Sequence, residues 1–496
     1  MAPNALDPLT TDSLAALKRD RALPGVTPTA IVVGAGVAGL AAAKALQAES
    51  FKVVVLESRD RVGGRVHTDY SFGVPVDMGA SWLHGVADVN PLSTLVRILQ
   101  LPLYRTSGDN SVLFDHDLES YRLYDDGKSV DPDLVAAVGE VFEEMLKETK
   151  AIRSELPPTE DMPMELALQS ALTRRPELVL TGVANRVLQW YICRMEGWFA
   201  ADLVNLSLRN WDQEDLLEGG HGLMVRGYAP VVGALASDLD VRLRHRVSHI
   251  RHGTSGVQVT CENGAVFRAD ALVMAAPLGV LKTGTIQFTP KLPEWKQSAI
   301  DGLGVGHENK VAFLFEYSFW PNVDFLGAVD DTSYGCSYFL NLHKATGNPV
   351  LVYMPAGSLS TDLDKMADDD VIEFALKELR SILPHAAAVK PLKAILSHWG
   401  KDPNTLGAYS YEIVGSNMEI YDRLAKSTGR LFFAGEATSR SFPGTVHGAY
   451  ASGTRAAGEI TRAYVEKLEH CTGVVGGEAG EGAEEVELLP LQISRL

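Results

Sequence analysis

Residues 29–57, TAIVVGAGVAGLAAAKALQAESFKVVVLE, decide the fold of this chain. The stretch opens and closes with a short apolar run, and an alanine-rich segment lies between the two. Apolar runs without alternation are typical of strands buried on both faces of a parallel sheet. Between the first run and the alanines stands the pattern G-x-G-x-x-G, formed by Gly34, Gly36 and Gly39. The predicted order is strand, glycine turn, helix, strand.

The glycines and one acid suit the binding of a dinucleotide. Gly34 permits a tight turn, Gly36 lets backbone amides approach a pyrophosphate, and Gly39 lets the helix pack on the strand. Glu57 ends the second run, 23 residues after Gly34 (57 − 34 = 23), where a carboxylate can accept hydrogen bonds from ribose hydroxyls. An acid there disfavours a 2′-phosphate and therefore NADP. The alternative is a glycine-rich turn that binds nothing.

A second glycine pair bears on the choice between FAD and NAD. Residues 55–65 read VLESRDRVGGR, in which Gly63 and Gly64 again bring backbone close to a cofactor and Arg65 can neutralise phosphate. This pair resembles the fingerprint of FAD enzymes with the glutathione-reductase-like fold. The alternative is a nicotinamide-dependent dehydrogenase, which the colour and spectrum of the purified protein would separate.

The composition limits the partners of the chain. Of its 496 residues 45 are basic and 63 acidic, which gives a formal charge of −18 and a pI of about 5.2. This balance argues against a nucleic-acid partner and suits cationic partners, although many acidic enzymes have none. No apolar run reaches the length of a membrane span, and the four cysteines lack metal-ligand spacing. Neither a membrane nor a metal site is therefore predicted.

The hydrophobic pattern changes along the chain. Short strands with turns are predicted from 241 to 276, with a hairpin signal at Asn263-Gly264. A further buried strand is predicted at Leu431–Ala434, and helices at Val371–Ile382 and Gly448–Leu468.

These elements predict a discontinuous nucleotide-binding domain into which a substrate-binding domain is inserted twice. The expected ranges are 29–88, 222–304 and 396–468 for the first domain, and 89–221 and 305–395 for the second. Outside them lie an N-terminal segment, 1–28, and an acidic tail, 469–496. The tail has too few apolar side chains to stay ordered, so we expect it to be flexible.

Three further stretches carry a resemblance to a known family. Residues 77–85 read DMGASWLHG, 434–436 read AGE, and 444–453 read GTVHGAYASG. With the glycine turns they resemble the flavin-containing amine oxidases, most closely the plant peroxisomal polyamine oxidases of the back-converting type. The resemblance runs from about Thr29 to Leu468 and includes the last three residues. It implies a mixed α/β fold, with an FAD-binding Rossmann-like domain and an inserted amine-oxidase substrate domain.

The resemblance also implies which residues hold FAD. Besides the three glycines of the first motif, the implied positions are Glu57, Arg65, Ala80, Trp82, Val247, Gly435, Glu436 and Val446. The positive end of the helix that starts near Val446 would stabilise the anion that develops on the reduced flavin. No cysteine stands near Tyr409, where monoamine oxidases attach the flavin, so FAD is expected to bind non-covalently.

Six residues are implied in the chemistry and in substrate binding. Lys310 matches the family lysine that reaches the flavin through a water, with an exposed lysine at a strand start as the alternative. His84 could hydrogen-bond the substrate nitrogen, and it could equally be structural. Glu196 and Glu308 are expected to bind distal ammonium groups, with surface carboxylates as the alternative.

Tyr409 matches one of two aromatic residues that sandwich the substrate in this family. Thr445 stands at the second aromatic position, which predicts hydrogen bonding there rather than stacking.

The resemblance implies a function. It predicts an FAD enzyme that oxidises spermine and spermidine with O2 to a shorter polyamine, 3-aminopropanal and hydrogen peroxide. Terminal breakdown of polyamines is an alternative, because the residues do not settle which C–N bond is cleaved or which polyamine is preferred. A histone-demethylase-like oxidase is disfavoured, since an N-terminal segment of some 28 residues leaves no room for the extra domain of that branch. A non-catalytic flavoprotein is a further alternative.

The last residues predict a location. The chain ends in Ser494, Arg495 and Leu496, a variant of the S-K-L peroxisomal signal. A flexible tail would present this tripeptide to the peroxisomal import receptor, so we expect a peroxisomal protein.

Overall fold

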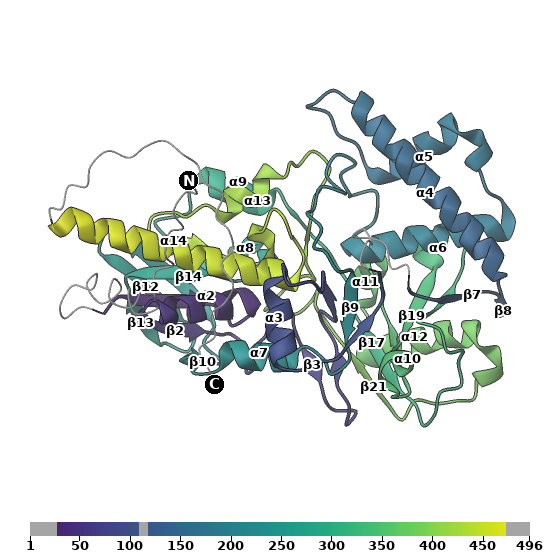
Figure 1. The fold of residues 1–496 in the computed structure, drawn as a ribbon, viewed down its shortest axis with the longest axis horizontal. Helices are drawn as coiled ribbons and strands as arrows, with labels where there is room; N and C mark the ends of the chain where they lie inside the picture. Colours follow the sequence, from purple (N-terminus) through teal and green to yellow (C-terminus); the bar gives the residue numbers. More distant parts are fainter. Residues whose placement is uncertain (1–26, 109–117, 473–496) are drawn as a thin grey trace, which may run out of the picture.

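The computed structural model describes residues 27–108 and 118–472. Figure 1 shows two halves side by side, one with helices α2 (Val37–Ala48) and α14 (Val446–Thr472), the other with helix α4 (Pro132–Glu155). Each half has its own β-sheet and its own buried core. This mixed α/β architecture confirms the predicted fold class.

A five-stranded parallel sheet forms the centre of the first half. Its strands follow the order β10 (Val241–Arg242), β2 (Lys52–Leu56), β1 (Thr29–Val33), β14 (Ala271–Met274) and β23 (Leu431–Phe433). Strand β1, helix α2 and strand β2 confirm the order predicted from residues 29–57. Because β1 lies in the middle, the glycine turn at its carboxyl end stands where ligands bind to open parallel sheets.

Small residues let two helices pack closely on one face of this sheet. Helix α2 buries its alanines at 41–43, and α14 crosses it at Gly453, where an added Cβ would lie 2.0 Å from the carbonyl oxygen of Ala38. Helix α7 (Ala229–Ala236) also contacts α2. Helix α14 begins two residues before the predicted helix and continues four residues past its predicted end.

A four-stranded sheet covers the other face. Its order is β13 (Val266–Ala269), β12 (Gly256–Cys261), β11 (Val247–Gly253) and β15 (Gln287–Thr289). Ile31 of β1 and Val259 of β12 belong to one buried cluster between the two sheets. The turn between β12 and β13 contains Gly264 with φ +85°, which confirms the predicted hairpin.

A seven-stranded sheet forms the centre of the second half. Its order is β21 (Lys393–Leu396), β17 (Val311–Leu314), β20 (Val350–Tyr353), β19 (Ser337–Asn341), β18 (Phe325–Ala328), β7 (Tyr121–Asp125) and β8 (Lys128–Ser129). Side chains alternate along its strands, so that Tyr338 packs toward one core and Phe339 toward another.

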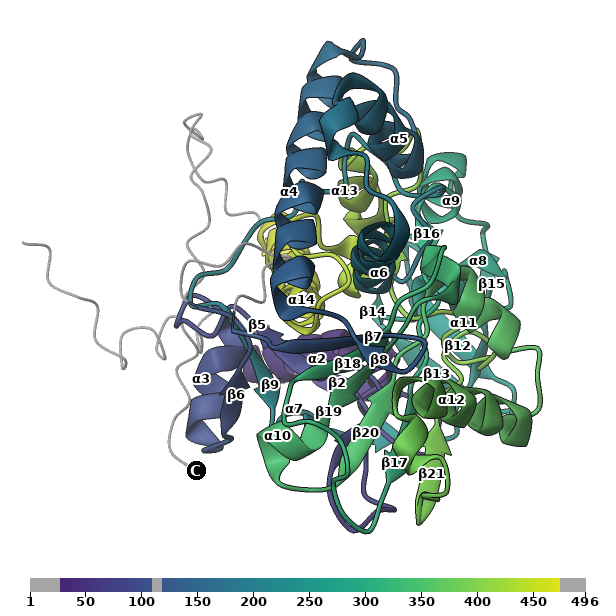
Figure 2. The ribbon, with the colours of Figure 1, turned by 90° about the vertical axis from the view of Figure 1, so that its right-hand side faces the viewer.

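Helices cover both faces of the second sheet (Figure 2). The helices α4, α5 (Met164–Arg174) and α6 (Gly182–Phe199) pack against one core, and α12 (Asp368–Ile382) packs against the other. Helix α12 confirms the helix predicted at Val371–Ile382. Thr149 and Ile152 of α4 are buried, although the outer face of this long helix is polar.

The junction of the two halves differs from the expected domain boundary. A three-stranded sheet joins β5 (Trp82–His84), β9 (His221–Met224) and β6 (Leu103–Arg105). Helix α3 (Pro91–Ile98) buries Leu92 and Val96 in the core of the first half. Residues 91–105 therefore belong with the nucleotide-binding half, not with the substrate-binding range that began at 89. The pairing of β6 with β9 holds this segment there.

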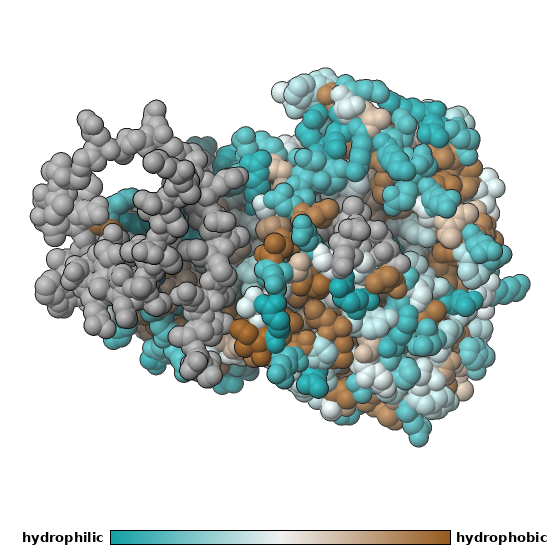
Figure 3. Space-filling view, in the orientation of Figure 1, coloured by the Kyte–Doolittle hydropathy of each residue, from teal (hydrophilic) through white to brown (hydrophobic). Residues whose placement is uncertain are grey.

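The remaining elements are short. They are α8 (Leu278–Lys282), α9 (Glu294–Asp301), α10 (Leu342–Thr346), α11 (Gly357–Leu363), α13 (Glu419–Ala425), β3 (Thr68–Asp69), β4 (Val76–Asp77), β16 (Gly304–Val305), β22 (Ser410–Tyr411) and the 3₁₀ turns Pro176–Leu178, Ser333–Gly335, Pro384–Ala386 and Glu436–Thr438. Figure 3 shows mostly hydrophilic residues over α4 and α5, and hydrophobic ones gathered near the middle of the view. Within 27–108 and 118–472, no helix combines the length and apolar character needed to cross a membrane.

Candidate functional site

A cavity of about 640 Å³ runs between the two halves. The first half contributes the turn between β1 and α2, residues 57–66 and the start of α14, whereas the second contributes the end of α6 and residues 308–310. Of the predicted cofactor residues, all except Gly39 line this cavity. Sequence positions that lie more than 400 residues apart therefore meet at one site.

The first glycine turn has the geometry that its sequence predicted. Gly34 has φ +102°, and a Cβ on Gly39 would lie 1.9 Å from the carbonyl oxygen of Gly34. Gly36 precedes α2 without a side-chain cap, and a Cβ there would meet nothing within 4 Å. Gly39 therefore serves the packing of helix on strand, while Gly36 opens onto the cavity and leaves the first turn of α2 accessible.

Glu57 stands beside this turn at the end of β2. Its carboxylate is buried and accepts hydrogen bonds from the backbone N–H groups of Ala35, at 2.7 Å, and Arg59, at 2.9 Å. These bonds fix the acid against the glycine turn and place it on the cavity wall. Its predicted contact with ribose hydroxyls stays a prediction.

The second glycine pair packs against the first. Gly63 and Gly64 both have positive φ, and Gly63 forms an isolated bridge with Gly36. The next residue, Arg65, donates from Nη1 to Oε1 of Glu436 at 2.9 Å and to the carbonyl oxygen of Ala408 at 2.8 Å. Two predicted cofactor residues thus form an ion pair across the cavity wall.

Glu436 connects several segments around the cavity. Its Oε2 accepts hydrogen bonds from Oγ of Ser410 at 2.6 Å and from the backbone N–H of Gly444 at 2.9 Å. Gly435 before it has φ +123°, and a Cβ there would meet nothing within 4 Å. The loop that precedes α14 is therefore held at a fixed place beside the cavity.

The start of α14 is capped by Thr445. Its Oγ1 accepts from the backbone N–H of Gly448 at 3.0 Å and donates to the carbonyl oxygen of Phe442 at 2.9 Å. The residue lines the cavity, and its hydroxyl takes part in the helix cap. The predicted hydrogen bonding to substrate at this position stays a prediction. Val446 follows as the first residue of the helix and lines the cavity as well.

Lys310 lies buried in the wall of the cavity. Its Nζ is 2.7 Å from the carbonyl oxygen of Gly79, 3.2 Å from that of Asp77 and 2.6 Å from Oγ of Ser81. Burial lowers the pKa of Lys310, and the carboxylates of Glu308 and Asp77 oppose this change. The alternative that Lys310 is an exposed lysine at the start of a strand is therefore wrong.

Glu308 and Tyr409 stand together near this lysine. The hydroxyl of Tyr409 is 3.0 Å from the carbonyl oxygen of Gly197, 3.1 Å from that of Trp198 and 3.4 Å from Oε2 of Glu308. Burial raises the pKa of Glu308, while Lys310 and Tyr409 oppose the rise. Both residues line the cavity, and their contacts with substrate stay a prediction.

His84 lines the cavity at the end of β5. Its Nδ1 lies 3.3 Å from Nδ1 of His221, and its ring lies edge-on to that of Trp198, with centroids 5.8 Å apart. The placement suits both predicted roles, because the residue faces the cavity and is also held by aromatic neighbours.

Glu196 is the predicted substrate residue that the structure places elsewhere. It is not among the residues of the cavity wall, and its Oε1 accepts a hydrogen bond from the backbone N–H of Leu203 at 3.1 Å. Burial raises its pKa to about 7. Arg194, Gly197 and Trp198 share the cavity face of α6, whereas position 196 lies about 200° around the helix from 194.

Several charged residues of the cavity wall, among them Glu214 and Arg194, were not predicted from the sequence. Glu214 lines the wall, and burial raises its pKa well above the ordinary value, with Glu412 and Glu436 raising it further. Arg194 lies over the ring of Phe325, 4.3 Å from its centroid, and also lines the wall. In the sequence Glu214 is one acid of an irregular polar stretch, which offers no periodic signal.

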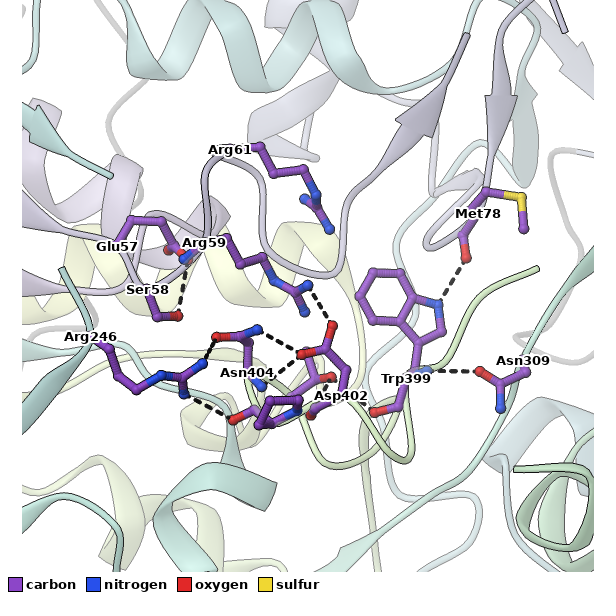
Figure 4. A network of polar contacts seen from close by, with 12 residues as sticks. Glu57, Ser58, Arg59, Arg61, Met78, Arg246, Asn309, Trp399, Asp402 and Asn404 are labelled. Atoms are coloured by element: carbon purple, nitrogen blue, oxygen red, sulfur yellow. Dashed lines mark hydrogen bonds and ion pairs between the residues drawn. The ribbon is translucent and has the colours of Figure 1, made fainter. Parts of the chain in front are cut away.

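A loop at 399–406 closes another side of the cavity (Figure 4). Asp402 pairs with Nη1 of Arg59 at 2.5 Å, and Oδ1 of Asn404 accepts from Nη2 of Arg246 at 2.6 Å. Trp399 donates from Nε1 to the carbonyl oxygen of Met78 at 2.8 Å. These contacts tie the loop to the first half, and no sequence pattern predicted them.

The family of the chain follows from comparison with known sequences. Residues 37–461 match the family described as flavin containing amine oxidoreductase. The chain belongs to this family. It is 56% identical over 473 residues to "Polyamine oxidase 2" of Arabidopsis thaliana, covering 95% of each chain, and 55% identical over 477 residues to "Polyamine oxidase 3" of Oryza sativa subsp. japonica, covering 95% of this chain and 97% of the relative.

More distant relatives lie in another branch. The chain is 38% identical over 450 residues to "Lysine-specific histone demethylase 1 homolog 3" of Oryza sativa subsp. indica. That alignment covers 87% of this chain and 54% of the relative.

The cavity of this flavin amine oxidase fits FAD. Cβ positions on Gly36 and Gly435 point into open space, the first turn of α2 has no side-chain cap to block a diphosphate, and the carboxylate of Glu57 lies beside that turn on the cavity wall. FAD, when bound, supplies the two-electron oxidation of an amine. The residues that line the cavity would hold the cofactor there. The enzyme is an FAD-dependent amine oxidase.

Two features of the cofactor site concern covalent attachment and metals. Cys193, Cys261 and Cys336 do not line the cavity, and non-covalent binding of FAD stays a prediction. In the part of the chain that the structure describes, no three His, Cys, Asp or Glu side chains gather as a metal site.

Proposed function

We propose that this amine oxidase acts on polyamines, oxidising spermine and spermidine with O2. The observation that carries the proposal is a pair of partly buried carboxylates, Glu308 and Glu214, on the wall of the cavity that also holds Lys310. A polyamine offers several ammonium groups at fixed spacing, and each can neutralise a carboxylate whose burial otherwise raises its pKa. The names of the two plant relatives at 55–56% identity support the same substrate class.

The proposed reaction removes hydride from a carbon next to a secondary amine. Water then adds to the resulting iminium, which breaks into an aldehyde and a shorter amine, while O2 takes the two electrons and becomes hydrogen peroxide. In this scheme Lys310 positions the water at the reacting edge of the cofactor, and the carboxylates hold the distal ammonium groups. The proposed products of back-conversion are 3-aminopropanal and spermidine from spermine, and 3-aminopropanal and putrescine from spermidine.

Product analysis tests this proposal. Purified enzyme is incubated with spermine, and the aldehyde, amine and peroxide are identified. Spermidine with 3-aminopropanal supports back-conversion, whereas 1,3-diaminopropane indicates attack on the other carbon and terminal breakdown. Absence of peroxide with both spermine and spermidine would overturn the proposal.

The histone-demethylase relatives supply a second candidate substrate, a methylated lysine in a peptide. The discriminating measurement compares the rate with spermine and the rate with a dimethyl-lysine peptide at equal concentration. We expect oxidation of spermine alone, and a faster reaction with the peptide would favour the second candidate.

Replacing Glu214 by glutamine should weaken polyamine binding. The substitution keeps the size of the side chain and removes one anion from the cavity wall, so KM for spermine is expected to rise about tenfold or more with little change in kcat. Steady-state kinetics measure both constants. Glu196→Gln is the matched control, because Glu196 is also partly buried but lies off the wall. Equal KM values for Glu214→Gln and the unaltered enzyme would count against this role.

We further propose that the enzyme is peroxisomal and that its import receptor binds the C-terminal tripeptide. Ser494, Arg495 and Leu496 lie outside the described residues, so the proposal rests on the sequence alone. A fluorescent protein fused to the N-terminus should mark peroxisomes in plant cells, and deletion of the tripeptide should leave the fusion in the cytosol. A punctate pattern that survives the deletion would refute it.

A further inference from the structure

The ammonium group of Lys310 has a complete set of hydrogen-bond partners within one short segment. An ammonium carries three protons and no acceptor. Its partners are the carbonyl oxygens of Asp77 and Gly79, at 3.2 and 2.7 Å, and the hydroxyl of Ser81, at 2.6 Å. Three protons therefore meet three acceptors when Lys310 is charged.

The three partners are not equivalent. The two carbonyl oxygens can only accept, whereas the hydroxyl of Ser81 can accept or donate. When Lys310 donates to it, the hydroxyl proton of Ser81 can point to the carbonyl oxygen of Gly79, 3.2 Å away. When Lys310 is neutral, the amine keeps two N–H bonds to the carbonyls and its lone pair can accept from Ser81. One rotating hydroxyl thus satisfies both protonation states.

The segment that carries these partners is fixed on several sides. The carbonyl oxygen of Ser81 accepts from the backbone N–H of Met224 at 2.9 Å, and that of Met78 accepts from Nε1 of Trp399 at 2.8 Å. A Cβ on Gly79 would lie 1.9 Å from the carbonyl oxygen of Arg65, so this position requires glycine. Ser81 is 5% exposed and is one of the residues that line the cavity.

We propose that Ser81 positions Lys310 and passes its proton to and from the cavity. In this step Nζ gives a proton to Oγ of Ser81, while the hydroxyl proton of Ser81 moves to a water or an amine in the cavity. Lysine loses one proton, the cavity base gains one, and no electrons are transferred. The inference rests on the proposed role of Lys310 in the oxidase.

The surroundings of Lys310 have opposing effects on its pKa. Burial lowers its pKa, and two carboxylates raise it, Glu308 from its own segment and Asp77 from β4. Asp77 is itself held by Thr68 and by the backbone N–H of Tyr228, and burial raises its pKa to about 6.

The test is a pH titration of the absorption spectrum of the bound flavin without substrate. A charge change at Lys310 should perturb this spectrum at a pH below the ordinary titration range of lysine, because burial lowers its pKa. Ser81→Ala removes an acceptor from the charged form and a donor from the neutral form. Because charge-assisted hydrogen bonds are the stronger, the midpoint should fall by about one pH unit. The pH profile of flavin reduction by spermine should shift in the same direction.

Three variants make the titration decisive. Ser81→Thr keeps a hydroxyl and should restore the midpoint of the unaltered enzyme. Ser397→Ala removes a hydroxyl that accepts from the backbone N–H of the same Lys310 at 2.8 Å, and it should not move the midpoint. Lys310→Met should abolish the titration.

Each contrary result would overturn the proposal. An unmoved midpoint in Ser81→Ala, an equal shift in Ser397→Ala, or a titration that persists in Lys310→Met would each do so. Absence of any titration in the unaltered enzyme would do so as well. Because the spectrum is read without substrate, failure of the enzyme to oxidise polyamines would be seen separately, as a normal titration without peroxide.

Discussion

Turnover of the Lys310→Met variant is expected to fall roughly 100-fold while FAD stays bound. Methionine preserves most of the length and packing of the buried side chain, but it cannot make the three hydrogen bonds of Nζ to Asp77, Gly79 and Ser81. The loss should therefore act on proton handling and on the positioned water, not on the glycine turns that hold the cofactor at another part of the cavity.

Rapid mixing separates the two half-reactions of this variant. Flavin reduction by spermine and reoxidation by O2 are followed by absorbance, and bound FAD is counted from the spectrum after gel filtration. Lys282→Met is the control, because Nζ of Lys282 donates to the carbonyl oxygen of Asp301 away from the cavity wall. Unchanged turnover of Lys310→Met with spermine would remove Lys310 from the mechanism.

The second large effect concerns a pair of glycines in one turn. In Gly36→Ala the added Cβ meets no atom within 4 Å and the backbone φ of −72° suits alanine, so the chain should fold as before. The methyl group nevertheless occupies the space in which the first turn of α2 meets a diphosphate. FAD affinity is expected to fall about 100-fold, with a change of under about 1 kcal/mol in the unfolding free energy.

Gly39→Ala should fail in a different way. Its Cβ would lie 1.9 Å from the carbonyl oxygen of Gly34, which is backbone and cannot move aside without a shift of α2 against β1. Thermal unfolding should therefore begin at a lower temperature, in addition to the loss of FAD. Circular dichroism and flavin content measure the two effects, and equal thermal stability of the two variants would contradict the separate roles of these glycines.

Sequence rules that act within a few residues predicted much of the fold. The glycine spacing at 34–39 predicted a strand–turn–helix, because each glycine meets a requirement of the backbone within a few residues. The hairpin at Asn263-Gly264 was predicted from the same kind of local requirement. These rules did not predict that residues 91–105 pack in the core of the first half. The direction in which α3 buries its apolar face depends on the partner of β6, and strand pairing across more than 100 residues leaves no local pattern.

The candidate site, too, was predicted from the sequence only in part. Glu57 and Lys310 stand in motifs that the family resemblance identified, and the structure places both on the wall of the cavity. Glu196 stood in an equally specific motif, yet the turn of α6 directs it away from that wall, and Glu214, in an irregular loop, takes a place there. A motif identifies a segment, whereas the face that each side chain presents depends on how that segment packs.

The sequence by itself determined the parallel nucleotide-binding sheet, the glycine turns and the amine oxidase family, because these depend on spacing within short segments. Only the tertiary structure decided that Arg65 pairs with Glu436, that Ser81 meets Lys310, and that the loop at 399–406 closes the cavity. Such contacts join side chains whose separation in the chain is more than 150 residues, and their geometry is set by the packing of two complete cores.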